Sequence, residues 1–303
     1  VIIILIRHAA IGFSFEDVHK VFYPFHRNHV NYAGIIALFF PIMVLATQWY
    51  NKKSIHRRLL IFSLILFFIA IYFSFTRAAY VALFIALGYY FVVQLRLTRP
   101  LVLASLLGLV LGMGYMIQDN RYLDYAPNFE RTITHKNFDN LIEATYQMED
   151  ISTMERVYRW VAGGHMIADQ PFLGYGPGNF VNFYERYTVT GFQTYVSDNE
   201  ERSGIHSYYL MTAVEQGLIG LAIFLLLVFY TLIRGEQIYH RIRDVAYKRI
   251  ALMMLLVLVV INAFQIINDL LETDKIGPFF FMAMAMLVNS DLATQEDEEE
   301  SDE

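Results

Sequence analysis

The chain has no cysteine and little charge. Without cysteine it can form no disulfide, no thiolate metal site and no thiol nucleophile. Only 17% of its 303 residues are charged whereas 56% are hydrophobic, and the mean hydropathy is +0.39. Soluble domains of this size seldom have so little charge. The composition therefore indicates an integral membrane protein.

Motifs for metal and nucleotide chemistry are also scarce. The sequence contains no Walker loop for nucleotide binding and no Asp-x-Asp pair for a divalent cation. The carboxylates closest to forming a cation cluster on the outer side are Glu272 and Asp274. His26 and His29 could bind a metal together, but no third ligand follows at a clear spacing. We therefore predict no metal, no ATP and no other cofactor. Much of the net charge of -6 lies in the acidic run at 296–303, so it indicates a solvated tail, and we predict no nucleic-acid partner.

Long apolar runs take up most of the rest of the chain, and we expect each to be a helix because lipid leaves no partner for an unpaired backbone group. The expected spans are 30–50, 59–75, 78–95, 101–117, 207–233, 250–268 and 276–289. The opening run, Val1–Ile6, is too short to cross a bilayer. We expect it to be the end of a helix that starts outside this chain, which would then be the C-terminal part of a longer protein.

The runs predict an all-α, polytopic membrane protein with about seven transmembrane helices plus a truncated one. Residues 1–117 would hold the truncated helix, an outer segment and four spans; 118–206 one large helical extracytoplasmic loop; 207–292 three spans; and 293–303 a disordered acidic tail. Lysine and arginine gather in the connections near 52–58, 96–99 and 234–249. These connections fall on one side, which the positive-inside rule makes cytoplasmic, so the loop at 118–206 faces outward.

Within this loop, Ser152–Glu155 matches a helix capping box and predicts a helix over 153–168. One face of that helix carries Arg156 and Arg159. A turn rich in proline and glycine follows at 171–180. Aromatic residues then repeat at helical spacing over 180–187, which suggests a short helix on the membrane surface.

Three further residues could contribute chemistry. Arg77 is the one cation in an apolar hairpin, so it either contacts an anionic lipid substrate or reaches out to the headgroups. Arg27 lies before the first complete span and suits phosphate binding or a polar helix cap. His206 begins a helix after the polar loop, where an imidazole can act as a base or merely cap the helix.

Several short motifs in this order resemble the family of O-antigen ligases and Wzy-type polymerases of bacterial envelopes. They comprise residues 28–33, 74–78, 171–180, 206–210 and 215–220. The resemblance implies a metal-independent, inverting glycosyltransferase in the inner (plasma) membrane with its site facing the periplasm. The donor would be a glycan on undecaprenyl diphosphate. His206 would match the family's basic histidine, and Arg77 and, as a less secure match, Arg27 would be the arginines that bind the diphosphate. Apart from the resemblance, we expect Arg156 and Arg159 of the loop helix to bind the diphosphate as well.

The acceptor that the resemblance implies depends on the type of family member. A ligase, which we prefer, transfers to lipid A-core and so serves lipopolysaccharide biosynthesis; a polymerase extends a polysaccharide; relatives glycosylate proteins. A transporter or flippase for lipid-linked glycans is a rival from another class, but it should carry charges at midspan. Here the polar residues cluster outside the spans, which favours an enzyme. A loop that merely docks a partner is a third possibility.

Overall fold

The computed structural model describes residues 1–15, 18–118, 151–188, 199 and 202–302. All regular elements among them are helices, as the sequence predicts. The chain divides into two compact units. The first unit comprises Val1–Thr98, Tyr230–Phe264 and Leu270–Glu303, and the second comprises Arg99–Phe229 and Gln265–Asp269. Parts of the predicted loop, 119–150 and 189–198, lie outside the described residues.

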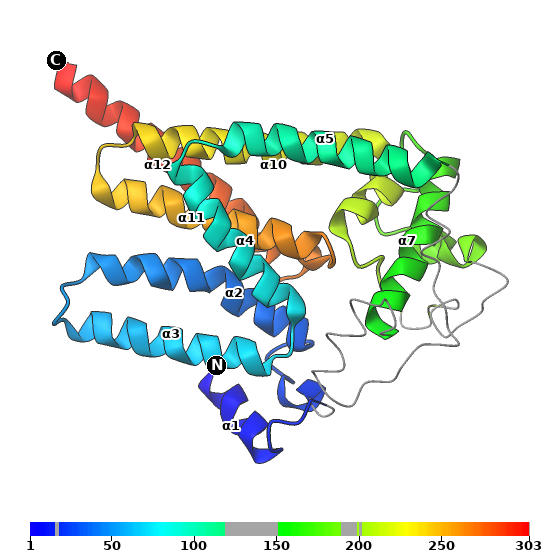
Figure 1. Ribbon diagram of the computed structural model, residues 1–303, viewed down its shortest axis with the longest axis horizontal. Coiled ribbons are helices and arrows are strands. Elements are labelled where there is room, and N and C mark those ends of the chain that lie inside the picture. The colour runs from blue at the N-terminus through cyan, green and yellow to red at the C-terminus, as the bar shows by residue number, and fades with distance from the viewer. Residues whose placement is uncertain (16–17, 119–150, 189–198, 200–201, 303) are drawn as a thin grey trace. The chain divides into compact units, whose positions relative to one another are not determined.

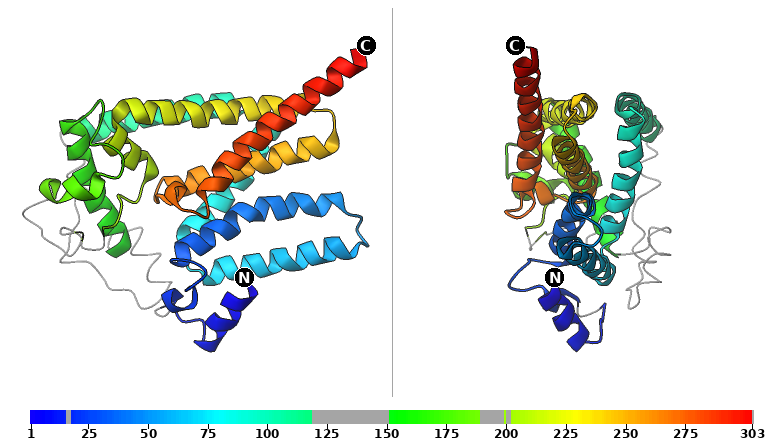
Figure 2. Two further views of the ribbon diagram at one scale, coloured as in Figure 1. Left: turned by 180° about the vertical axis from the view of Figure 1, so that it is seen from behind. Right: turned by 90° about the vertical axis from the view of Figure 1, so that its left-hand side faces the viewer.

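The first unit is built mainly from long apolar helices (Figure 1). In chain order its elements are α1 (Ile2–Ala10), η1 (Val18–Val21), α2 (His29–Ala46), η2 (Thr47–Trp49), α3 (Ile55–Phe73), α4 (Arg77–Gln94), the end of α10 (Tyr208–Arg241), α11 (Val245–Gln265), η6 (Leu270–Glu272) and α12 (Gly277–Asp302). Two views show α2 and α3 lying side by side (Figure 2). From Ala251 to Ile261 every residue of α11 is buried, as expected of the central helix of such a unit.

Within the described part of the chain, five helices are long and apolar enough to cross a membrane, namely α2 with η2, α3, α4, α10 (Tyr208–Arg241) and α11. This confirms a multi-pass arrangement of apolar helices, while the expected number of about seven stays a prediction. The helix of α5 covers Thr98–Ile117, but its described apolar part ends at Gly112. In α12 the structure differs from the expected disordered tail, because the helix continues to Asp302. Glutamate is a good helix former, which favours this extension.

The second unit contains a small core of its own. It is formed by α7 (Ile151–Asp169), α8 (Phe180–Phe183), η5 (Tyr184–Tyr187) and the first part of α10. The helix predicted at 153–168 is confirmed and is slightly longer. Its core cluster consists of Tyr158, Ala162, Met166, Phe180, Tyr184, Ile205, Met211 and Val214. Phe180 and Tyr184 are fully buried there. These two aromatics therefore contribute to the core, where the sequence suggested contact with the membrane surface.

The turn at 171–180 is bonded to a break in α10. Gly217 has φ 69° and ψ -177° inside this helix, a conformation essentially restricted to glycine. The break leaves helix carbonyls without their usual donors. The turn supplies replacements, because the Tyr175 amide donates to the Val214 carbonyl at 3.0 Å and the Gly176 amide donates to the Glu215 carbonyl at 2.8 Å. In the opposite direction, the amide of Leu218 donates to the carbonyl of Pro171 at 2.7 Å.

Candidate functional site

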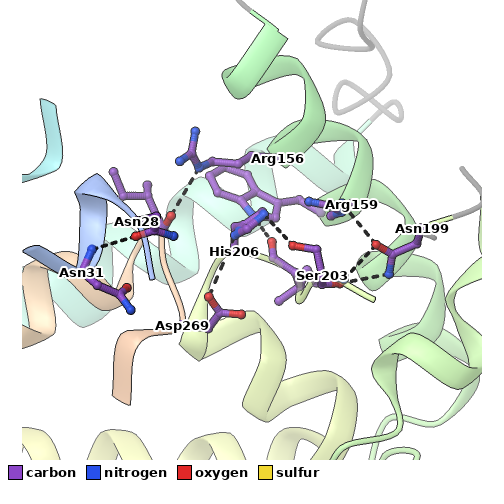
Figure 3. A network of polar contacts seen from close by, with 11 residues as sticks. Asn28, Asn31, Arg156, Arg159, Asn199, Ser203, His206 and Asp269 are labelled. Carbon is purple, nitrogen blue, oxygen red and sulfur yellow. Dashed lines mark hydrogen bonds and ion pairs between the residues drawn. The ribbon is translucent and has the colours of Figure 1, made fainter. Parts of the chain in front are cut away.

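His206 lies just before α10 in the second unit, between a hydroxyl and a carboxylate (Figure 3). Its Nε2 is 3.2 Å from Ser203 Oγ, and its Nδ1 is 3.9 Å from Asp269 Oδ1. The side chain is 28% exposed. The imidazole is thus held from two sides and still accessible to a substrate.

The backbone of His206 is left-handed, with φ 57°. Non-glycine residues rarely adopt this conformation, and it costs of order 1–3 kcal/mol unless the surroundings impose it. Asn199 and Arg202 in the same loop also have positive φ, at 45° and 50°. Three left-handed residues in one short loop indicate that its shape is imposed by the packing around it.

Hydrogen bonds from neighbouring elements impose that shape. The Asn199 side chain closes the loop, because its Oδ1 accepts from the Ser203 amide at 3.0 Å and its Nδ2 donates to the Ser203 carbonyl at 2.9 Å. From α7, Trp160 Nε1 donates to the carbonyl of Ile205 at 3.1 Å. On the far side of His206, the Tyr208 amide donates to the carbonyl of Asn268 at 3.1 Å. The last bond also brings the segment that carries Asp269 beside the imidazole.

Burial and nearby positive charge determine the protonation of His206. Desolvation, followed by the positive charges of Arg159 and Arg156, lowers the pKa of His206 from 6.5 to about 3. Asp269 acts in the opposite direction, since a carboxylate favours the imidazolium. The free site therefore holds a neutral imidazole at pH 7. An anion that neutralised the two arginines would make the same imidazole more basic.

The two arginines of α7 occupy different environments. Arg159 is only 4% exposed, and its Nη2 donates to Asn199 Oδ1 at 3.2 Å. Arg156 is half-buried, and its Nε donates to the carbonyl of Ile267 at 3.3 Å. Arg159 is thus part of the framework of the loop, whereas Arg156 is more accessible and also touches the segment leading to Asp269.

The other two predicted arginines lie in the first unit, at neighbouring helix N-termini. Arg77 is the first residue of α4 and is half-buried, and Arg27 is exposed just before Asn28, the N-cap of α2. The turn before α4 contacts the start of α2, where Thr76 Oγ1 donates to the His29 carbonyl at 3.5 Å. Helix N-termini favour anions, so this end of the unit is electropositive. The proximity of these arginines to His206 stays a prediction.

Asp269 and Ser203 are site residues that sequence reasoning missed. Asp269 is far from His206 in the sequence, and a single sequence contains no pattern that pairs them. A weak signal existed, because Asp269 begins one of the segments that the charge pattern places on the outer side. The serine has no recognisable motif around it.

Comparison with protein families identifies the chain. The family model described as Wzy_C, O-antigen ligase, matches residues 62–225, which is more than half of the chain. The match includes Arg77, Arg156, Arg159 and His206, and it leaves out Arg27 and Asp269. No curated protein matches the chain. The chain therefore belongs to the O-antigen ligase family.

Proposed function

We propose that this protein transfers a glycan from undecaprenyl diphosphate to an acceptor hydroxyl, and that the acceptor is lipid A-core, as in an O-antigen ligase. Family membership supports glycosyl transfer at a membrane in general. The observation that carries the proposal is the accessible, neutral imidazole of His206 with Asp269 on one side and two arginine charges nearby. We place the donor and this site at the periplasmic side of the inner membrane.

In the proposed reaction, His206 takes the proton of the acceptor hydroxyl. The acceptor oxygen attacks the anomeric carbon as the bond from that carbon to the diphosphate oxygen breaks, which inverts the configuration. The proton ends on the imidazole, and the bond electrons leave with the lipid diphosphate. No metal is required if arginines neutralise the developing charge, an electrostatic contribution that reaches several kcal/mol in a site that excludes water.

Asp269 and the arginines would act at different stages. Before the donor binds, burial of the imidazole, together with the positive charges of Arg159 and Arg156, keeps His206 deprotonated. The diphosphate then neutralises part of that positive charge, and the imidazole becomes a stronger base when a base is needed. Asp269 stabilises the imidazolium that forms. We assign direct contact with the diphosphate to Arg156 and an indirect role to the buried Arg159, while diphosphate binding by Arg77 and Arg27 stays a prediction.

The test compares His206→Ala and Arg77→Ala with Arg186→Ala, a control at an exposed arginine stacked on Phe183. In cells, the first two variants should abolish attachment of surface glycan while the undecaprenyl-linked glycan accumulates, and the control should retain attachment. Normal attachment in both site variants at normal expression would refute the mechanism. Locating labelled glycan on lipid A-core, on a longer glycan or on protein distinguishes ligase, polymerase and protein O-oligosaccharyltransferase.

A further inference from the structure

Two large apolar side chains protrude from the turn at 171–180. Phe172 is 69% exposed and Leu173 is 76% exposed. They follow Pro171 and precede Gly174, whose φ is 64°, so the backbone around them is restrained. We refer to Phe172 and Leu173 as the apolar tip. Both side chains belong to the second unit, and neither is part of its core cluster, where Phe180 and Tyr184 are fully buried.

The apolar tip is fixed against the break in α10. A Cβ at Gly217 would collide with the carbonyl of Phe172 and the amide of Leu173. The Leu218 amide donates to the Pro171 carbonyl at 2.7 Å. With backbone contacts on both sides of Gly217, the tip lies at the same level along α10 as that glycine.

The sequence of α10 sets the depth of Gly217 in a bilayer. From Gly217 to Ile233 there is no charged residue, whereas Glu215 and Arg234 lie just beyond either end. This stretch measures about 25 Å at ~1.5 Å per residue, slightly less than the hydrocarbon thickness of about 30 Å. Gly217 must therefore lie at the hydrocarbon boundary if α10 spans the membrane.

The exposed apolar surface of α10 begins at the same level. Leu218 is 43% exposed, Ile219 50% and Ile223 64%. In a membrane-spanning helix such a surface faces lipid. The backbone of the apolar tip lies beside Gly217 and Leu218, where this surface begins. Lipid at this level favours the two exposed large apolar side chains, which would be costly in water.

We propose that Phe172 and Leu173 insert into the acyl-chain region of the leaflet that α10 enters. The occupant of this surface is membrane lipid. Insertion supports the loop of the second unit at a second point besides α10, and it holds His206 of the same unit at a constant height above the bilayer surface. The inference rests on the membrane-spanning character of α10 and is independent of the proposed glycosyl transfer.

The absence of cysteine makes the test direct, because single cysteines can be introduced for nitroxide labels without removing others. Labels at Leu173→Cys, Leu226→Cys and Ala168→Cys are compared in the whole protein in phospholipid bilayers. Leu226 is 71% exposed within the apolar stretch of α10, and Ala168 is exposed on α7. Collision with molecular oxygen reports lipid, and collision with a water-soluble nickel chelate reports water.

The ratio of oxygen to nickel collisions at residue 173 should resemble that at residue 226 and exceed that at residue 168 severalfold. A ratio at 173 equal to that at 168 would place the tip in water and overturn the proposal. A label at 173 shielded from both reagents would mean that protein, a partner or a second copy, covers the tip, and it would overturn the proposal as well. Phe172→Cys provides an independent reading if Leu173→Cys does not fold.

Discussion

Replacing Glu215 by glutamine should loosen the turn at 171–180 from α10. Glu215 is 5% exposed, and its carboxylate accepts two backbone amides, from Gly178 at 2.8 Å and from Phe180 at 3.0 Å. A glutamine oxygen can replace only one of these acceptors, and its NH₂ group then faces the other amide. One buried donor left unsatisfied costs about 1–3 kcal/mol, and the remaining bond loses its charge assistance. We expect the local opening free energy to fall by about 2–4 kcal/mol.

Hydrogen exchange of the whole protein in bilayers measures this opening. If opening governs exchange, the amides of Gly178 and Phe180 should exchange about 25- to 700-fold faster in Glu215→Gln, since every ~1.4 kcal/mol is a factor of ten. Glu185→Gln is the matched control, because Glu185 is an exposed glutamate on η5 of the same unit. Unchanged exchange at both amides in Glu215→Gln would refute the assigned role of the carboxylate, and equal acceleration in both variants would show a general charge effect.

Two further predictions concern the imidazole. The pKa of His206 is about 3 in the folded protein, against an ordinary value of 6.5. Between these two pH values the unfolded state binds a proton that the folded state does not bind. The free energy of unfolding should therefore fall as the pH falls from about 6.5 to about 3. Thermal unfolding in detergent from pH 7 to 4 should show a weaker pH dependence in His206→Gln than in the unsubstituted protein, and an identical slope would contradict the low pKa. Asp269→Asn should slow transfer tenfold or more by the ~10²–10⁴ scale of general-base catalysis, with an unchanged KM for the lipid-linked donor. Asp274→Asn, at a carboxylate that is 84% exposed, should leave the rate unchanged, and an equal loss in both variants would exclude a specific role for Asp269.

The helices could be predicted from the sequence because lipid admits few alternatives. An apolar run of sufficient length must satisfy its backbone internally, so the regions of α2, α3, α4, α10 and α11 follow from composition. The residues at which the helices end could not be predicted in this way, because hydropathy does not determine them. The last turns of α10 extend to Arg241, where Arg234 and Arg241 pair with Asp291 on α12, and hydropathy contains no information about such pairs.

The candidate site was only partly predictable. Motif spacing led to His206 and to Arg156 and Arg159, but it treated the two arginines as equivalent. Only packing shows that Arg159 is buried against Asn199. Likewise, Asp269 lies beside the imidazole of His206 only because the chain folds in this way. A local sequence pattern shows which residues share a helix face. Contacts between residues that are distant in the sequence depend instead on how the helices and loops pack together.

The structure also favours one of the two interpretations that the sequence allowed for His206. If this residue merely capped α10, its side chain would accept an amide from the first turn of the helix. Ser207 occupies the cap position instead, and its Oγ lies 3.5 Å from the donating amide of Leu210. His206 lies one residue earlier, in a left-handed conformation that glycine or asparagine would adopt more readily. His206 is held in this conformation, does not cap the helix and faces Asp269 and Ser203, which agrees with the proton transfer that we propose for it.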